Sequence, residues 1–168
     1  SQLVLIDPKP AEATVAFARE KDVRLLDSPI GILTHVLVLA AKPQVIKDVM
    51  AEVAPAVGPH TLVISIAAGI TIRTIADALH TERIVRSMPN TPAQLGKGIS
   101  GAVGATISDE DRATADALLG AAGQVVWLES EAGIDAVTAV SGSGPAYVFY
   151  MVEALAALLG CFTAPDCP

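Results

Sequence analysis

Short apolar segments alternate with helical segments along most of the chain, a pattern typical of a parallel β-sheet with crossover helices. Strands are predicted at residues 3–6, 36–40, 61–66, 83–88, 98–106 and 124–128. Helices are predicted at residues 11–21, 41–53, 71–79, 108–122 and 145–159. Gly123 is expected to lie just beyond the end of the fourth helix, as its cap. This order predicts an α/β fold, a Rossmann-like doubly wound and mostly parallel sheet.

Turns of small or polar residues follow four of the predicted strands. They are Asp7-Pro8-Lys9, Ala40-Ala41-Lys42-Pro43, Ala67-Ala68-Gly69 and Met88–Pro92. Ligands of doubly wound sheets bind outside the carboxyl ends of the strands, and small residues there let a flat ring or a ribose approach the backbone. Each turn alone can be an ordinary turn. Four turns on one rim predict a ligand site.

Three charged residues lie in these turns, and each could contact a ligand or serve only the turn or the solvated surface. Asp7 ends the first strand, where a Rossmann fold places an acid that binds the ribose 2′-hydroxyl, but it can also belong to a simple Asp-Pro turn. Lys9 could instead accept a 2′-phosphate. Lys42 could pair with a cofactor phosphate or ribose, or could be a solvated lysine at a helix start.

Two further motifs carry polar groups. Two prolines fix the backbone on either side of Asn90 and Thr91, and a loop stiffened in this way holds an amide and a hydroxyl in a set place. Residues 141–145 (SGSGP) supply two hydroxyls before a predicted helix, whose exposed amides would favour a carboxylate or phosphate. A hinge between two domains is the alternative. A serine hydrolase is not indicated, because no G-x-S-x-G with His and acid partners is evident.

Composition limits the partners. The formal net charge of −7 argues against nucleic acid or an anionic membrane as a ligand. A mean hydropathy of +0.53 predicts apolar surface that a partner covers. No apolar run approaches the roughly 18–20 residues of a membrane span, and no signal peptide is evident, so a cytoplasmic protein is expected. Cys161 and Cys167 complete no disulfide or metal site.

Four ordered segments resemble the pyrroline-5-carboxylate reductase family. They are residues 40–44 (AAKPQ), 63–71 (VISIAAGIT), 85–92 (VRSMPNTP) and 135–147 (DAVTAVSGSGPAY), and the resemblance covers nearly all of residues 3–155. It implies reduction of the ring imine of 1-pyrroline-5-carboxylate to L-proline with NADPH or NADH. The hydride chemistry would belong to the cofactor.

The resemblance also distributes the candidate site residues. It implies that the dinucleotide lies along Ala40, Ala41, Lys42 and Pro43, that Ala67 and Ala68 lie near the nicotinamide end, and that Asn90 and Thr91 lie where cofactor and substrate meet. With Asp7 and Lys9, these are the candidate cofactor-binding residues. The candidate substrate-binding residues are Ser141, Gly142, Ser143 and Gly144. No catalytic residue is assigned, and no metal site is expected.

The chain departs from the family pattern at both ends. The family opens with a strand and a G-x-G-x-M-G loop, which do not precede Ser1, so we expect the sheet to lack that central strand and to have a gap there. Residues 160–168 do not resemble the family continuation. We therefore expect residues 1–140 to be an N-terminally incomplete dinucleotide-binding domain, and residues 141–168 to be the start of a truncated helical dimerisation domain in a homo-oligomer.

Two alternatives to this reductase remain. One is a catalytically inactive nucleotide-binding or regulatory remnant, and the other is a different imine or carbonyl reductase on the same cofactor domain. Without the glycine loop and the rest of the helical domain, the 168-residue chain is expected to show little or no pyrroline reduction.

Overall fold

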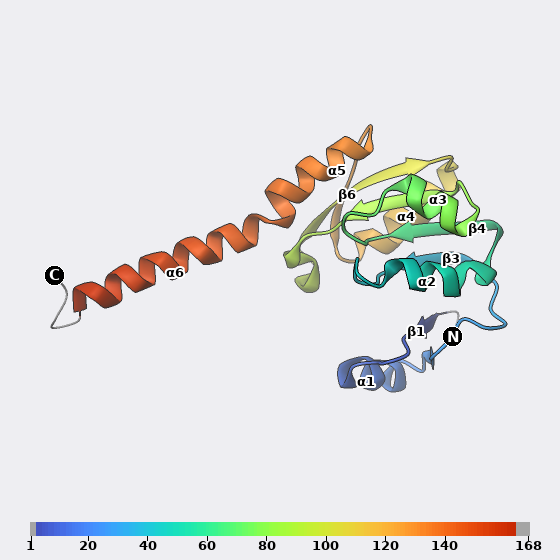
Figure 1. Cartoon of the computed structure of the whole chain (residues 1–168), viewed down its shortest axis with the longest axis horizontal. Helices are drawn as coiled ribbons and strands as arrows, with labels where there is room; N and C mark the ends of the chain where they lie inside the picture. The colour runs from blue at the N-terminus through green and yellow to red at the C-terminus, as the bar shows by residue number, and fades with distance from the viewer. Residues whose placement is uncertain (1–2, 164–168) are drawn as a thin grey trace.

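The strands of the computed structural model, which describes residues 3–163, form two separate sheets (Figure 1). The smaller sheet pairs β1 (Val4–Ile6) in parallel with β2 (Arg24–Leu26), and α1 (Glu12–Glu20) connects them. The larger sheet contains, in order, β3 (Thr34–Leu39), β4 (Val57–Ser65), β5 (Ile84–Met88), β6 (Gly98–Ala105) and β7 (Gly123–Trp127). Only the β5–β6 pair of the larger sheet is antiparallel. The predicted mostly parallel α/β sheet is confirmed.

Helices cover both faces of the larger sheet. The helices that follow β3, β4 and β6 are α2 (Ile46–Val53), α3 (Ile72–Leu79) and α4 (Asp109–Gly120). Successive residues of β4 point to opposite faces, so Val63 packs with α2 and α3 while Leu62 and Ile64 pack with α4. This arrangement explains why the buried half of β4 contains the apolar run Leu62–Ile64, because a central parallel strand is buried on both faces.

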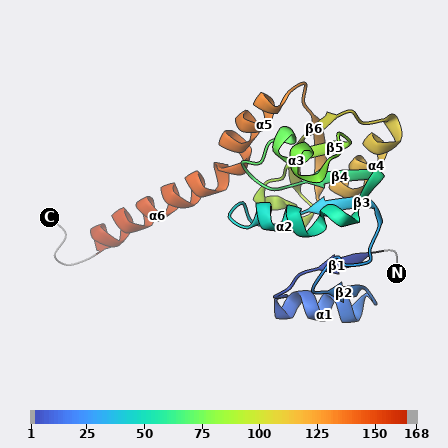
Figure 2. The same cartoon turned by 45° about the vertical axis from the view of Figure 1, so that its right-hand side comes forward.

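The two sheets separate between β1 and β3, where the resemblance predicts a gap. The β1–α1–β2 unit lies beside β3 but outside the larger sheet, as both views show (Figure 2). Strand β3 is therefore an edge strand, and its Val38 side chain is 49% exposed.

One strand and one α-helix of the described chain were not predicted, and two helix ends differ from the prediction: α2 begins at Ile46 and not at residue 41, and α4 ends earlier than expected. Strand β2 and helix α5 (Glu131–Val137) are short and lack a clear apolar period. Helix α4 ends at Gly120, and Gly123 is the first residue of β7 instead of a helix cap. Its φ of 139° and its position against Gly98 explain the glycine, because a Cβ at residue 123 would overlap the Gly98 backbone.

The chain ends in a helical arm made of α5, the π-helical turn η3 (Thr138–Gly142) and α6 (Gly144–Thr163). Figure 1 shows α6 leading away from the body of the molecule. Helix α6 starts at Gly144, within one residue of the predicted start, but the amides before it are not open, because the helical run is continuous from Glu131 and the Ser143 N–H donates to the Thr138 carbonyl at 2.9 Å. Helix α6 continues to Thr163, and residues 164–168 lie outside the described residues.

Helix α6 presents apolar side chains all around. Nine of them are between 52% and 76% exposed: Tyr147, Val148, Phe149, Tyr150, Met151, Val152, Leu155, Leu158 and Leu159. The helical run Glu131–Leu159 is long and apolar enough to cross a membrane by length and composition alone, so the expectation that no segment reaches that length is wrong. A helix whose side chains are covered by a second subunit is also long and apolar on its surface.

Candidate functional site

Three of the four predicted ligand turns leave one edge of the larger sheet side by side. The strands β3, β4 and β5 are parallel neighbours, and their register pairs Leu39 with Ser65 and Ser65 with Arg86. The turns at residues 40–43, 67–69 and 88–92 follow these strands directly. This edge is where an open parallel sheet binds its ligand. The fourth turn, at residues 7–9, ends β1 in the smaller sheet.

The turn after β4 is held closely. Ala67 is 4% exposed, and its N–H donates to the Ser65 hydroxyl at 3.3 Å. Gly69 has a φ of 72°, and Thr71 then caps α3 by accepting a hydrogen bond from the Thr74 N–H at 3.2 Å. A ligand beside Ala67 and Ala68 would therefore meet a fixed backbone without large side chains.

The turn after β3 offers small residues and a cation. Ala40 and Lys42 are exposed, and Ala41 is half-buried. Within the described part of the chain, Lys42 forms no ion pair, so its ammonium group is available to a phosphate. Pro43 opens the turn that leads into α2, and it is exposed.

The Asn90 side chain has a fixed orientation. Its Oδ1 accepts a hydrogen bond from the Ile99 N–H at 2.9 Å, at the start of β6. The Nδ2 group is left with its two donors for a ligand. Thr91 follows Asn90 directly, is exposed and begins the 3₁₀ turn η2 (Thr91–Leu95).

The arm brings the predicted substrate residues to the same neighbourhood. A Cβ added to Gly142 would lie 3.7 Å from Met88 Cε, so the base of the arm contacts the end of β5. The Ser141 hydroxyl donates to the Val137 carbonyl at 3.1 Å. Ser143 is half-buried and its side chain has no hydrogen-bond partner among the described residues, while Gly144 begins α6. These residues stay candidates for substrate contact.

The two predicted residues that follow β1, Asp7 and Lys9, lie in a turn of the smaller sheet. Asp7 Oδ1 accepts a hydrogen bond from the Lys9 N–H at 2.9 Å, which is the turn that an Asp-Pro sequence favours. One carboxylate oxygen of Asp7 remains open to a ribose hydroxyl. Lys9 is exposed.

An ion pair near the site was not anticipated from the sequence. Arg86 of β5 is 5% exposed, and its Nη1 lies 2.7 Å from Glu131 Oε1 at the start of α5. The same Oε1 accepts a hydrogen bond from the Ile72 N–H at 3.0 Å. An arginine inside an otherwise apolar strand was the available signal, since a buried guanidinium requires an acidic partner.

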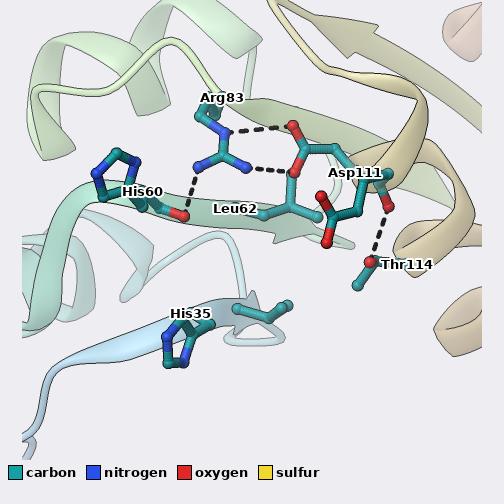
Figure 3. Close-up of a pocket in the computed structure, with 8 residues that line it drawn as sticks. His35, His60, Leu62, Arg83, Asp111 and Thr114 are labelled. Atoms are coloured by element: carbon teal, nitrogen blue, oxygen red, sulfur yellow. Dashed lines mark hydrogen bonds and ion pairs between the residues drawn. The ribbon is translucent and has the colours of Figure 1, made fainter.

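A separate pocket of about 270 Å³ lies at the opposite, amino-terminal ends of the strands (Figure 3). It is lined by His35, Val36, His60, Leu62, Arg83, Glu110, Asp111 and Thr114. Arg83 donates from Nε and Nη2 to Asp111 at 3.2 and 2.5 Å, and from Nη1 to the His60 carbonyl. The guanidinium is thus occupied by the fold, and this pocket is not the predicted ligand edge.

Asp111→Asn is expected to lower the free energy of unfolding by about 2 kcal/mol at neutral pH, because it removes a buried partner of Arg83. The hydrogen bonds from Arg83 lower the pKa of Asp111 below its ordinary 3.8; burial opposes them, and Ser108 adds to the lowering. The stabilisation is therefore present above the ordinary pKa and is lost as pH falls through the lowered pKa. Urea unfolding of both proteins across acidic pH measures this. A difference that stays constant down to pH values below the lowered pKa would contradict the assignment.

Within the part of the chain that the structure describes, no group of three His, Cys, Asp or Glu residues is placed to hold a metal ion.

Comparison with known proteins identifies the relatives of this chain. A family model described as "Pyrroline-5-carboxylate reductase dimerisation" matches residues 131–159, which are α5, η3 and most of α6. The pyrroline-5-carboxylate reductase of Pseudomonas aeruginosa is 49% identical over 122 residues, covering 71% of this chain and 45% of the relative. That of Vibrio alginolyticus is 41% identical over 162 residues, covering 88% of this chain and 60% of the relative.

A solved structure agrees with the sequence relatives. The pyrroline-5-carboxylate reductase of Coxiella burnetii superimposes with a TM-score of 0.79 at 33% identity, covering 94% of this chain and 61% of that one. The chain thus spans between 45% and 60% of the length of the first curated relatives that it matches.

Proposed function

Because the chain belongs to the pyrroline-5-carboxylate reductase family, we propose that the protein reduces 1-pyrroline-5-carboxylate to L-proline with NADPH or NADH. The observation that carries this proposal is the meeting of three ligand turns at the carboxyl edge of β3, β4 and β5. The Plasmodium falciparum relative, 25% identical with a TM-score of 0.76 over 91% of this chain and 56% of that one, was solved with NADP bound.

The residues at the edge suit a dinucleotide. Small side chains at Ala40, Ala41, Ala67 and Ala68 leave room for a ring or a ribose, and the unpaired Lys42 offers a cation to a phosphate. The bound cofactor would supply a hydride to the imine carbon. The task of this chain is to hold the cofactor and the substrate close together and to exclude water.

Binding groups for the substrate would come from two elements. Asn90 Nδ2 and the Thr91 hydroxyl project from the loop after β5. The Ser143 hydroxyl, which has no partner among the described residues, could donate to the substrate carboxylate, while Ser141 is engaged with the Val137 carbonyl. We therefore assign the carboxylate contact to the segment Ser141–Gly144, with Ser143 as its main donor.

The domain limits and partners follow the same proposal. We place a dinucleotide-binding domain in residues 1–140 and the start of a helical domain in residues 141–168; the π-helical turn η3 lies at this junction. Two arms would pair to form a homo-oligomer, since the match to the dimerisation model covers the exposed helix. Pairing of two arms would cover the apolar side chains of α6 without a membrane. We therefore propose a cytoplasmic location.

Titration of the purified protein with NADPH and NADH, followed by nucleotide fluorescence, tests cofactor binding. Consumption of the reduced nucleotide on addition of 1-pyrroline-5-carboxylate tests the reaction. Binding of one nucleotide is the expected result for the 168-residue chain, and imine-dependent oxidation is expected of a protein that spans the full length of the curated relatives. A protein that binds neither nucleotide would refute the proposal.

Asn90→Asp is expected to weaken nucleotide or substrate binding by about 100-fold. The new carboxylate still accepts the Ile99 N–H, so the loop keeps its anchor, but both amide donors are lost and a negative charge is added. The same titrations measure the loss.

Gln124→Glu is the matched control for Asn90→Asp. It makes the same amide-to-acid change at an exposed position on β7 and is expected to leave binding unchanged. Equal losses in both variants would mean that net charge, and not the Asn90 amide, determines binding.

A further inference from the structure

A single carboxylate oxygen joins three parts of the molecule. Glu131 Oε1, at the base of the arm, lies 2.7 Å from Arg86 Nη1 in β5 and 3.0 Å from the Ile72 N–H at the start of α3. These residues are 45 and 59 positions away in sequence. The oxygen is thus a meeting point for the strand before Asn90, the helix after the Ala67–Gly69 turn, and the arm.

Each of the two contacts meets a physical need. The Arg86 side chain is 6% exposed, and a buried guanidinium without a counter-ion is costly. The first N–H groups of a helix have no partner within the helix, so an acidic oxygen from outside caps α3 and complements its dipole. Thr71 caps the Thr74 N–H, and Glu131 caps the Ile72 N–H.

The neighbouring acid cannot replace Glu131. Asp135 Oδ1 lies 3.8 Å from Arg86 Nη2, and its side chain is 80% exposed, so water screens this pair. Among the described residues, no hydrogen bond or ion pair joins Asp135 to α3.

We infer that Glu131 is a positioning residue that holds the turn after β4, strand β5 and the base of the arm in one fixed arrangement. Its reach, which lets one oxygen serve Arg86 and Ile72 together, is what matters for this role. The benefit for catalysis rests on the proposed function, because these three parts carry the candidate nucleotide and substrate residues. The arrangement itself does not depend on that proposal.

A pair of conservative variants separates reach from charge. Glu131→Gln keeps the length and an acceptor oxygen but loses the charge, while Glu131→Asp keeps the charge but is one methylene shorter. Hydrogen–deuterium exchange of the protein without ligands reports on the Ile72 amide. We expect exchange of this amide to be about 10-fold faster or more in Glu131→Asp, and near the wild-type rate in Glu131→Gln.

Two further proteins complete the design. Asp135→Asn is the control and is expected to leave the Ile72 amide unchanged. Glu131→Ala is expected to expose this amide at least as much as Glu131→Asp; if it does not fold, the two conservative variants still decide. Amides of β4, such as Val63, serve as an internal reference for global opening.

Three outcomes would overturn the inference. The first is an unchanged exchange rate of the Ile72 amide in Glu131→Asp. The second is a greater loss of protection of this amide in Glu131→Gln than in Glu131→Asp. The third is an equal acceleration of exchange at Ile72 and Val63 in Glu131→Asp. In parallel, nucleotide titration is expected to show weaker binding by Glu131→Asp than by Glu131→Gln. A wild-type protein that binds no nucleotide would refute the proposed function and leave the exchange result standing on its own.

Discussion

Gly123→Ala is expected to lower the free energy of unfolding by more than about 4 kcal/mol, or to prevent folding altogether. The backbone of Gly123 has a φ of 139°, which L-residues rarely adopt. An added methyl group would also overlap the carbonyl of Gly98 in the neighbouring strand, where only backbone movement could make room. The strands β6 and β7 start at this pair, so relief of the overlap would break the parallel ladder at its first residues. Urea unfolding measured by circular dichroism gives the loss.

Gly120→Ala is the matched control for this substitution. Gly120 is the last residue of α4, has no positive φ, and has no atom within 4 Å of an added Cβ. Alanine also favours the helix there, so the control is expected to be neutral or stabilising by up to about 1 kcal/mol. Similar stabilities for the two variants would show that residue 123 is not constrained as the structure describes.

Leu155→Asp is expected to weaken self-association by at least about 1,000-fold. The Leu155 side chain is 52% exposed on α6, a helix that presents apolar side chains all around. In a pair of identical arms, the substitution would bury two unpaired carboxylates, one from each arm, and their desolvation cost is not compensated. Analytical ultracentrifugation over a range of protein concentrations measures the dissociation constant.

Leu95→Asp adds the same charge at a leucine that is 78% exposed in the η2 turn, outside the arm. This control is expected to associate as the wild type does. A wild-type protein that remains monomeric at high concentration would contradict pairing through the arm, as would an unchanged dissociation constant for Leu155→Asp.

The central sheet was predictable because its signals are local. The run Thr61–Ser65 is apolar enough to mark a strand that is buried on both sides, and the small residues at 67–69 mark its end. Parallel strands place such ends on one edge, so the candidate site followed from strand order. The same reasoning could not find β2, whose three residues carry no periodic signal.

The features that escaped prediction depend on contacts between distant residues. The role of Glu131 needs Arg86 and Ile72 to be near it in space, and no spacing in the sequence reports that. Gly123 resembles a helix cap because it follows a helix; only its distance from Gly98 reveals its place in the sheet. The helical character of residues 138–144 was hidden by Gly142 and Gly144, because glycines ordinarily suggest a loop.

The turn η3 sets the angular phase between the two halves of the arm. Ile134 of α5 is buried against the body of the molecule, which fixes the orientation of α5. Helix α6, beyond the turn, makes few contacts with the body. Each residue of an α-helix advances the side chains by about 100°, so the number of residues in the turn decides which stripe of α6 faces a partner. Loss of one residue there would leave every helix intact and point a different stripe outward. Under the proposed pairing of two arms, the number of residues in the turn would therefore set the geometry of the pair, together with the identity of the side chains.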